Sequence, residues 1–157
     1  MKLSIAPETF SNLLNVFLEE TFETHHGIYL DKNNALFATL DTISAEEASI
    51  PVGGKCASLA AQVAHTTFYI ESFERYAFEG DDSPRDWGDI WRRVEKVNAE
   101  EWQEYKNQLR AAYGRMQNVI RNNPDWNEDA IGGVLGVIVH SAYHLGEIRQ
   151  AMCTLKA

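Results

Sequence analysis

The spacing of apolar residues constrains the fold of this chain more than any other feature. Four long segments repeat apolar residues every three or four positions, and no useful length alternates as a strand does. The clearest segment follows Asn98 and carries its apolar positions at Trp102, Tyr105, Leu109, Ala112, Met116 and Ile120. The sequence therefore predicts an all-α protein.

The first long helix is predicted to run from about Pro7, a residue suited to a helix start, to the His25–His26 region. Gly27 interrupts the pattern, which resumes with Leu36–Leu40, and Ser44–Glu47 has the spacing of a capping box. The buried face of this helix is predicted to carry Phe10, Leu13, Leu14, Phe17, Leu18 and Thr21.

The second long helix is predicted to begin after Ser58 as its N-cap and to end near Gly80. A connection over 81–97 is expected to contain a short helix, and the fourth long helix begins near Asn127 or Glu128 and runs almost to the C-terminus. Four amphipathic helices of about 20 residues favour a four-helix bundle. We expect one domain over residues 1–157, with an N-terminal helical extension and a short helix between helices 2 and 3.

Composition is that of an ordinary soluble globular protein, with 45% hydrophobic and 24% charged residues. The formal net charge of −9 opposes binding to nucleic acids and to anionic membranes. No uninterrupted apolar run reaches the roughly 20 residues that span a bilayer, and the N-terminus lacks the apolar stretch of a signal peptide. We therefore expect a cytoplasmic protein with no membrane and no nucleic-acid partner.

Two histidines, His140 and His144, lie one helical turn apart in the otherwise apolar segment 131–155. An i, i+4 pair shares one face of a helix, and imidazole nitrogens suit metals such as zinc and nickel. The alternative is that both are ordinary core or surface histidines. A third histidine, His65, borders the apolar face of the second long helix, and bundle cores are where facing helices assemble metal sites.

These histidines carry a resemblance to a known family. Ser58 precedes His65 by seven residues, and the fourth helix reads His140-x-x-x-His144-x-Gly-Glu147-Ile. This pattern resembles the DinB/YfiT-like superfamily of metal-dependent four-helix-bundle proteins. The resemblance covers roughly residues 45–155 and is weaker before residue 45. There Gly27 interrupts the helical pattern, whereas members of the superfamily usually have one simpler helix.

The resemblance implies that His65, His140 and His144 bind one divalent metal ion, nickel or zinc first and iron or manganese as further options. Water or substrate would complete the shell. It also implies a homodimer, for which Tyr76, Trp87 and Trp91 are candidate contacts. Characterised relatives include enzymes that use low-molecular-weight thiols such as bacillithiol or mycothiol.

The implied function is therefore a thiol-dependent S-transferase, in which an open metal position holds the thiol cosubstrate. A metal-dependent hydrolase is a close variant. A non-catalytic metal-binding or stress-associated dimer is the alternative from another class, because a fold does not fix a function. No residue is assigned as a catalytic acid or base.

Several residues near this motif have two interpretations. Glu147, one turn past His144, is either a hydrogen-bond acceptor that orients an imidazole or a solvent-exposed or arginine-paired carboxylate. Trp87 and Trp91 are either an aromatic flap over a pocket or, as we favour, a hydrophobic plug or dimer contact. His26 could approach the site from helix one, although a polar helix end is the favoured interpretation for the His25–His26 pair.

The two cysteines, Cys56 and Cys153, form no Cys-x-x-Cys pair and are expected to be free, buried thiols. Nine helical residues span about 13.5 Å, which is too far for Cys153 to share a metal with His144. Cys56 precedes its helix, so the same exclusion is not firm for it.

Overall fold

A computed structural model of the protein describes residues 5–54, 56–123 and 125–155, and within these residues it contains helices and no strand. The prediction of an all-α protein is confirmed. The long helices are α1 (Pro7–Phe22), α4 (Leu59–Phe78), α6 (Ala99–Asn122) and α7 (Glu128–Leu155). The short ones are α2 (Leu36–Leu40), α3 (Ala45–Ala48), the 3-10 turn η1 (Val52–Gly54) and α5 (Asp89–Arg93), which is the short helix expected after α4.

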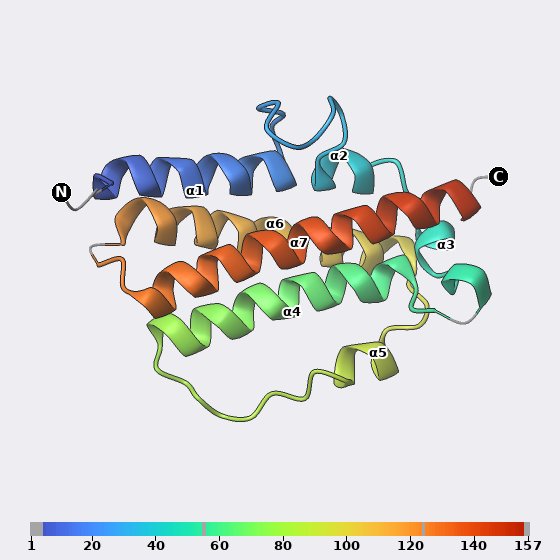
Figure 1. The fold of residues 1–157 in the computed structure, drawn as a ribbon. Helices are drawn as coiled ribbons and strands as arrows, with labels where there is room; N and C mark the ends of the chain where they lie inside the picture. Colours follow the sequence, from blue (N-terminus) through green and yellow to red (C-terminus); the bar gives the residue numbers. More distant parts are fainter. Residues whose placement is uncertain (1–4, 55, 124, 156–157) are drawn as a thin grey trace.

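The four long helices lie side by side along the length of the molecule (Figure 1). Helix α4 packs against α6 and α7, and α1 packs against the same two helices, so α1 and α4 occupy opposite corners. Helices α1 and α7 run in one direction, and α4 and α6 run in the other (Figure 1). The segment that contains α5 crosses back along α4, which it contacts. One side of α4 therefore faces α7 and another faces this connection.

Capping residues fix three helix starts where the sequence predicts them. Ser44 and Glu47 form a complete capping box at α3, and Asn98 and Glu101 form another at α6. At α4 the hydroxyl of Ser58 accepts a hydrogen bond from the third N–H of the helix. These bonds satisfy backbone donors that have no partner inside the helix, so they set where each helix begins.

Helix α1 ends at Phe22 and does not reach the His25–His26 region as predicted. The reason is Glu20, a fully buried carboxylate that accepts hydrogen bonds from the N–H groups of Gly27, Ile28 and Leu30. Burial opposes ionisation of Glu20, but these hydrogen bonds hold its pKa below the ordinary value. The chain must therefore turn back around the carboxylate after Phe22, which stops the helix.

The predicted buried face of α1 is too broad. Leu14 and Leu18 are buried, whereas Leu13 and Phe17 are exposed. Positions 13 and 17 lie 100° around the helix from 14 and 18, and only the latter pair faces α6 and α7. In α6, by contrast, Trp102, Leu109, Ala112, Met116 and Ile120 are buried as predicted, and Tyr105 is partly buried.

Helix α7 is long and apolar enough, by length and composition alone, to cross a membrane. The prediction of no membrane-spanning segment rested on uninterrupted apolar runs, and polar residues such as His140 and His144 interrupt the run in this helix. In this structure 39% of the apolar window is buried within the protein, and the core helix of a soluble protein meets the same criterion. The cytoplasmic location stays a prediction.

Candidate metal centre

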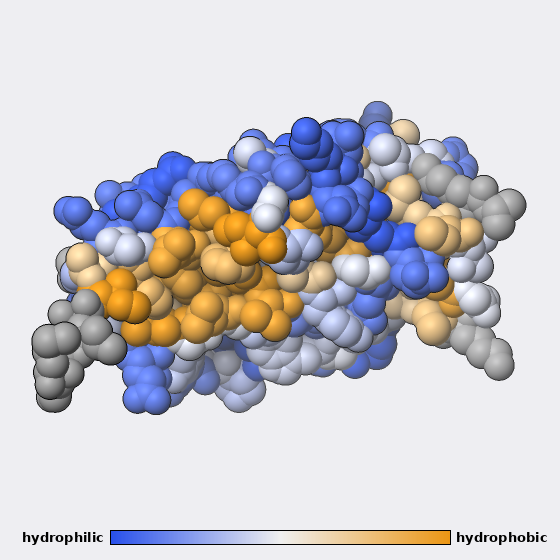
Figure 2. Space-filling model, turned by 45° about the horizontal axis from the view of Figure 1, so that its top comes forward, coloured by the Kyte–Doolittle hydropathy of each residue, from blue (hydrophilic) through white to orange (hydrophobic). Residues whose placement is uncertain are grey.

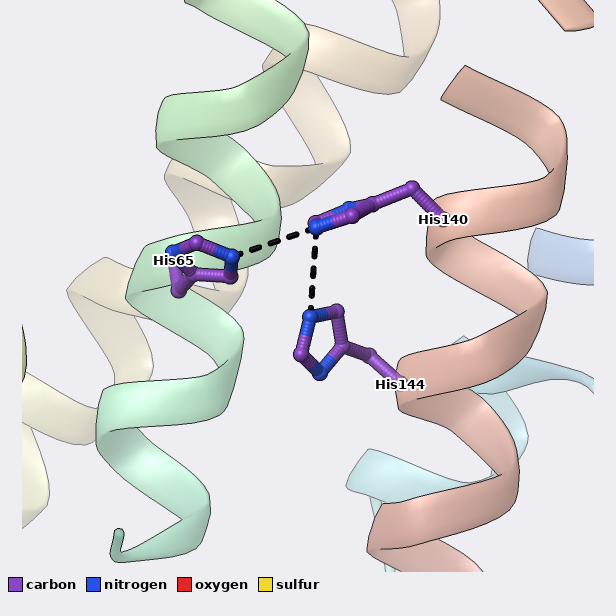
Figure 3. A group of neighbouring side chains, drawn as sticks. All are labelled: His65, His140 and His144. Carbon is purple, nitrogen blue, oxygen red and sulfur yellow. Dashed lines mark hydrogen bonds between the residues drawn. The ribbon is translucent and has the colours of Figure 1, made fainter. Parts of the chain in front are cut away.

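Three histidines converge between α4 and α7 (Figure 3). His65 comes from α4, and His140 and His144 come from successive turns of α7. The Nε2 atom of His140 lies 3.1 Å from that of His65 and 3.3 Å from that of His144. Among the described residues, this is the one group of three or more metal-ligating side chains whose ligand atoms lie within 4.8 Å of one another. The predicted trio is thus brought together.

The separations match those of ligands that share one ion. A tetrahedral centre with metal–nitrogen bonds of about 2.0–2.1 Å separates its ligand nitrogens by about 3.3–3.4 Å. The observed distances of 3.1 and 3.3 Å are close to this value. Three neutral ligands leave a fourth position open, which is typical of catalytic rather than structural zinc sites.

The ring protons cannot satisfy both Nε2 contacts of His140 at once. His144 Nδ1 lies 3.3 Å from Gln62 Oε1 and 3.0 Å from Glu147 Oε2. Because both oxygens are acceptors, this Nδ1 carries the proton, and Nε2 of the neutral ring holds a lone pair. His140 Nε2 must then donate its one proton to His144, so it has neither a second proton nor a free lone pair for the contact with His65. A cation that accepts three lone pairs removes this conflict.

Burial keeps the rings neutral. Burial first, and the neighbouring histidines second, lower the pKa of His65 to about 4 and that of His140 to about 4. Burial also lowers the pKa of His144, against the opposing effect of Glu147. His65 is 9% exposed and His144 is 5% exposed. At neutral pH the three rings therefore present lone pairs and no charge, as metal ligation requires.

Glu147 contacts His144, as the interpretation of Glu147 as a hydrogen-bond acceptor for an imidazole requires. Its Oε2 lies 3.0 Å from His144 Nδ1, and its Oε1 accepts a hydrogen bond of 2.6 Å from the hydroxyl of Tyr143. The alternative of a solvent-exposed carboxylate holds in part, because the Glu147 side chain is 38% exposed, and Arg149 donates to Thr39. A carboxylate behind an imidazole fixes the ring orientation and raises the basicity of its other nitrogen.

Sequence reasoning missed Gln62, which is buried and reaches His144 from α4. It also missed Tyr69, whose ring lies flat on that of His140 with centroids 3.8 Å apart and planes 11° apart. The available signal was helical spacing, since Gln62, His65 and Tyr69 recur at intervals of three and four on one face of α4.

Aromatic rings pack against His65 and His140, the two histidines whose Nδ1 atoms form no hydrogen bond. The Nδ1 atoms of His65 and His140 are buried and have no hydrogen-bond partner. Trp91 covers the His65 ring with centroids 4.4 Å apart, as Tyr69 covers His140. Gly136 helps to place Tyr69, because a Cβ atom there would lie 3.1 Å from the tyrosine oxygen. For these two histidines, ring packing thus takes the place of the hydrogen bond that Nδ1 of a metal-binding histidine usually donates.

Trp87 and Trp91 have different neighbours. Trp91 contacts His65 and His144, whereas Trp87 packs against Phe68 and Tyr69. Each lines a separate cleft, of about 660 Å³ for Trp91 and about 280 Å³ for Trp87. None of the three histidines lines either cleft, and of the two tryptophans Trp91 alone touches the trio. Both the flap and the plug interpretation stay predictions.

The remaining candidates take no part in the histidine trio, although Cys56 lines the same cleft as Trp91. Cys56 and Cys153 are free, as predicted, but both are exposed rather than buried. Cys56 precedes α4, and Cys153 lies on the outer face of the last turns of α7, so neither reaches the core. His26 lies 3.1 Å from Glu19 and takes no part in the trio, in line with the favoured interpretation of a polar helix end.

No family model, no curated protein and no solved structure matches the chain. The resemblance to the DinB/YfiT-like superfamily accordingly stays a prediction. What is established is the geometry: an all-helical protein in which three histidines lie close enough to hold one metal ion.

Proposed function

We propose that this protein binds one divalent cation through His65, His140 and His144, and that it is a four-helix bundle of the DinB/YfiT-like type. The observation that carries the proposal is the convergence of three Nε2 atoms at separations of 3.1 and 3.3 Å. The chemistry of the ligands favours nickel or zinc over iron or manganese, because three imidazoles and no carboxylate face the centre.

We further propose that the site is catalytic and that the reaction is a thiol-dependent S-transfer. A cation in an open three-histidine site lowers the pKa of a thiol and holds it as the thiolate. Gln62 and Glu147 fix the orientation of His144, while Tyr69 and Trp91 exclude water from the other two rings. None of the three histidines lines the cleft of about 660 Å³, but Trp91 contacts both this cleft and His65, so a polar thiol cosubstrate would have room beside the centre.

We also infer that the protein forms a homodimer. Figure 2 shows an apolar area on the face that α1 and α7 share, and both of these helices expose large apolar side chains. These are Leu13 and Phe17 from α1 and Leu135 and Val139 from α7. A second copy is the favoured occupant, because the net charge of −9 opposes an anionic membrane surface.

The transferase proposal is tested with protein purified without a metal-affinity tag. Bound metal is measured first, and thiol conjugation to a panel of electrophiles is then assayed with and without chelator. We expect activity that the chelator abolishes and that His65→Ala and His140→Ala lose, while the matched control His25→Ala, in an exposed loop, keeps it.

Stoichiometric metal without thiol conjugation would contradict the transferase and support a non-catalytic metal-binding protein. Chelator-sensitive hydrolysis of ester or amide substrates without conjugation would support the hydrolase instead.

A further inference from the structure

The indole ring of Trp91 lies between the histidine trio and the cleft of about 660 Å³. Its centroid is 4.4 Å from that of the His65 ring and 6.4 Å from that of the His144 ring. The same tryptophan lines the cleft, which none of the three histidines lines. Trp91 is therefore part of the wall that separates the cleft from the His65 and His144 side of the trio.

This wall shields His65 from a molecule in the cleft. His65 is 9% exposed, and its Nδ1 atom is buried and has no hydrogen-bond partner. Its Nε2 atom lies 3.1 Å from that of His140, inside the trio. A ligand that moves from this cleft to the three Nε2 atoms must therefore pass Trp91.

The Trp91 ring is less firmly held than the helix that carries it. The indole N–H groups of Trp102 and Trp126 each donate a hydrogen bond, whereas that of Trp91 donates to none of the residues that the structure describes. Trp91 is also 37% exposed. Helix α5 is too short to be stable by itself, so the buried side chains of Ile90 and Val94 hold it in place. The indole can thus leave His65 without breaking a hydrogen bond or releasing α5.

We propose that Trp91 is the gate of the histidine centre, and that the thiol cosubstrate passes from the cleft to the centre when the indole moves away from His65. The proposal assigns the flap interpretation to Trp91 and not to Trp87, which packs on Phe68 and Tyr69. The passage of a thiol rests on the proposed function. The shielding of His65 does not, because it is a property of the metal-free protein.

The first test uses the metal-free protein and diethyl pyrocarbonate, which acylates neutral imidazoles, with the modified histidines identified by peptide mass spectrometry. The exposed His25 is the internal reference. Trp91→Ala is expected to raise the modification rate of His65 relative to His25 about tenfold, because the barrier of one aromatic contact is lost. Trp87→Ala, in the same connection, is the matched control and is expected to leave this ratio unchanged.

A second variant guards against a general loss of structure. Trp91→Phe keeps a smaller ring over His65, so its modification rate is expected to lie between those of the wild type and Trp91→Ala. Circular dichroism spectra equal to that of the wild type check the folding of each variant.

The second test follows the binding of 2-mercaptoethanol to the cobalt(II)-loaded protein without oxygen, by stopped-flow absorption of the thiolate-to-cobalt charge-transfer band. A gate changes the rates of entry and exit together and leaves the equilibrium affinity unchanged. We expect both rates to rise about tenfold in Trp91→Ala, with the affinities for cobalt and for the thiol unaltered. A purely structural role of Trp91 would instead alter these affinities.

The gate is overturned if His65 reacts as slowly in folded Trp91→Ala as in the wild type, or if Trp87→Ala exposes it equally. Equal thiol-binding rates in Trp91→Ala and the wild type overturn it as well. A wild type that binds no cobalt refutes the proposed function instead, and the metal-free measurement then decides on the shielding by Trp91.

Discussion

At the scale of single residues, the histidine trio could be predicted and most of its surroundings could not. Helical spacing is a local property, so it identified His140 and His144 from the sequence. Glu147 lies on the same helix and was found in the same way. Helical spacing places Gln62 on the same face of α4 as His65, but its contact with His144, like the contact of Trp91 with His65, depends on how α4 packs against α7 and α5, which no local pattern records.

Glu147→Gln is expected to weaken metal binding about tenfold, because an outer carboxylate typically contributes that much through its histidine. The measurement is a competition titration of zinc against a chelating indicator. Glu100→Gln, at an exposed position of α6, is the matched control and is expected to bind zinc as the wild type does. Equal affinities of Glu147→Gln and wild type would mean that Gln62 alone orients His144.

The buried histidines also predict how stability depends on pH in the metal-free protein. Their ordinary pKa is 6.5, and in the folded protein it is about 4 for His65 and about 4 for His140. Between these values the unfolded chain binds more protons than the folded one, so the free energy of unfolding falls as the pH is lowered from 6.5 to 4.

Urea denaturation across this range of pH should show that fall, and His65→Ala or His140→Ala should reduce it. The same pH dependence in wild type and in both variants would contradict the assigned burial.

At the scale of helices, starts were predicted better than ends. Ser58 and Asn98 cap their own helices, so their effect is visible in a few neighbouring letters. The end of α1 depends on Glu20, whose partners lie seven to ten residues later in a loop with no periodic pattern. The contact between α4 and α7 depends on Gly133, where a Cβ atom would overlap the ring of Phe73.

Gly133→Ala is therefore expected to destabilise the protein by about 1–3 kcal/mol, the usual cost of overpacking. Gly132→Ala is the matched control, because its Cβ would meet open space in the same helix. It is expected to stabilise the protein by about 0.5–1 kcal/mol, since alanine is the better helix former. Urea denaturation measures both, and a Gly133→Ala protein as stable as Gly132→Ala would contradict the close approach of the two helices.

At the scale of the whole molecule, periodicity predicted the all-helical class, but it did not predict which apolar residues lie on the outer surface. The sequence suggested Tyr76, Trp87 and Trp91 as dimer contacts, and all three line clefts beside α4. The apolar area on α1 and α7 (Figure 2) was missed because periodicity marks an apolar position without showing whether another helix covers it.

If this face joins two copies, Val139→Glu should produce a monomer in sedimentation velocity experiments. Val139 is 66% exposed, so the change leaves the fold intact and places a charge in the interface. Ala111→Glu, at an exposed position of α6, is expected to leave the dimer unchanged. A dimer of undiminished stability in Val139→Glu would place the interface elsewhere.

The most direct test of the metal centre is a titration of the metal-free protein with cobalt(II), followed by its visible absorption. We predict an endpoint at one equivalent, with the intense bands of a four-coordinate, nitrogen-ligated ion, and loss of these bands in His65→Ala and His140→Ala but not in His25→Ala. No such bands in the wild type, or equal bands in all four proteins, would contradict a site built from His65, His140 and His144.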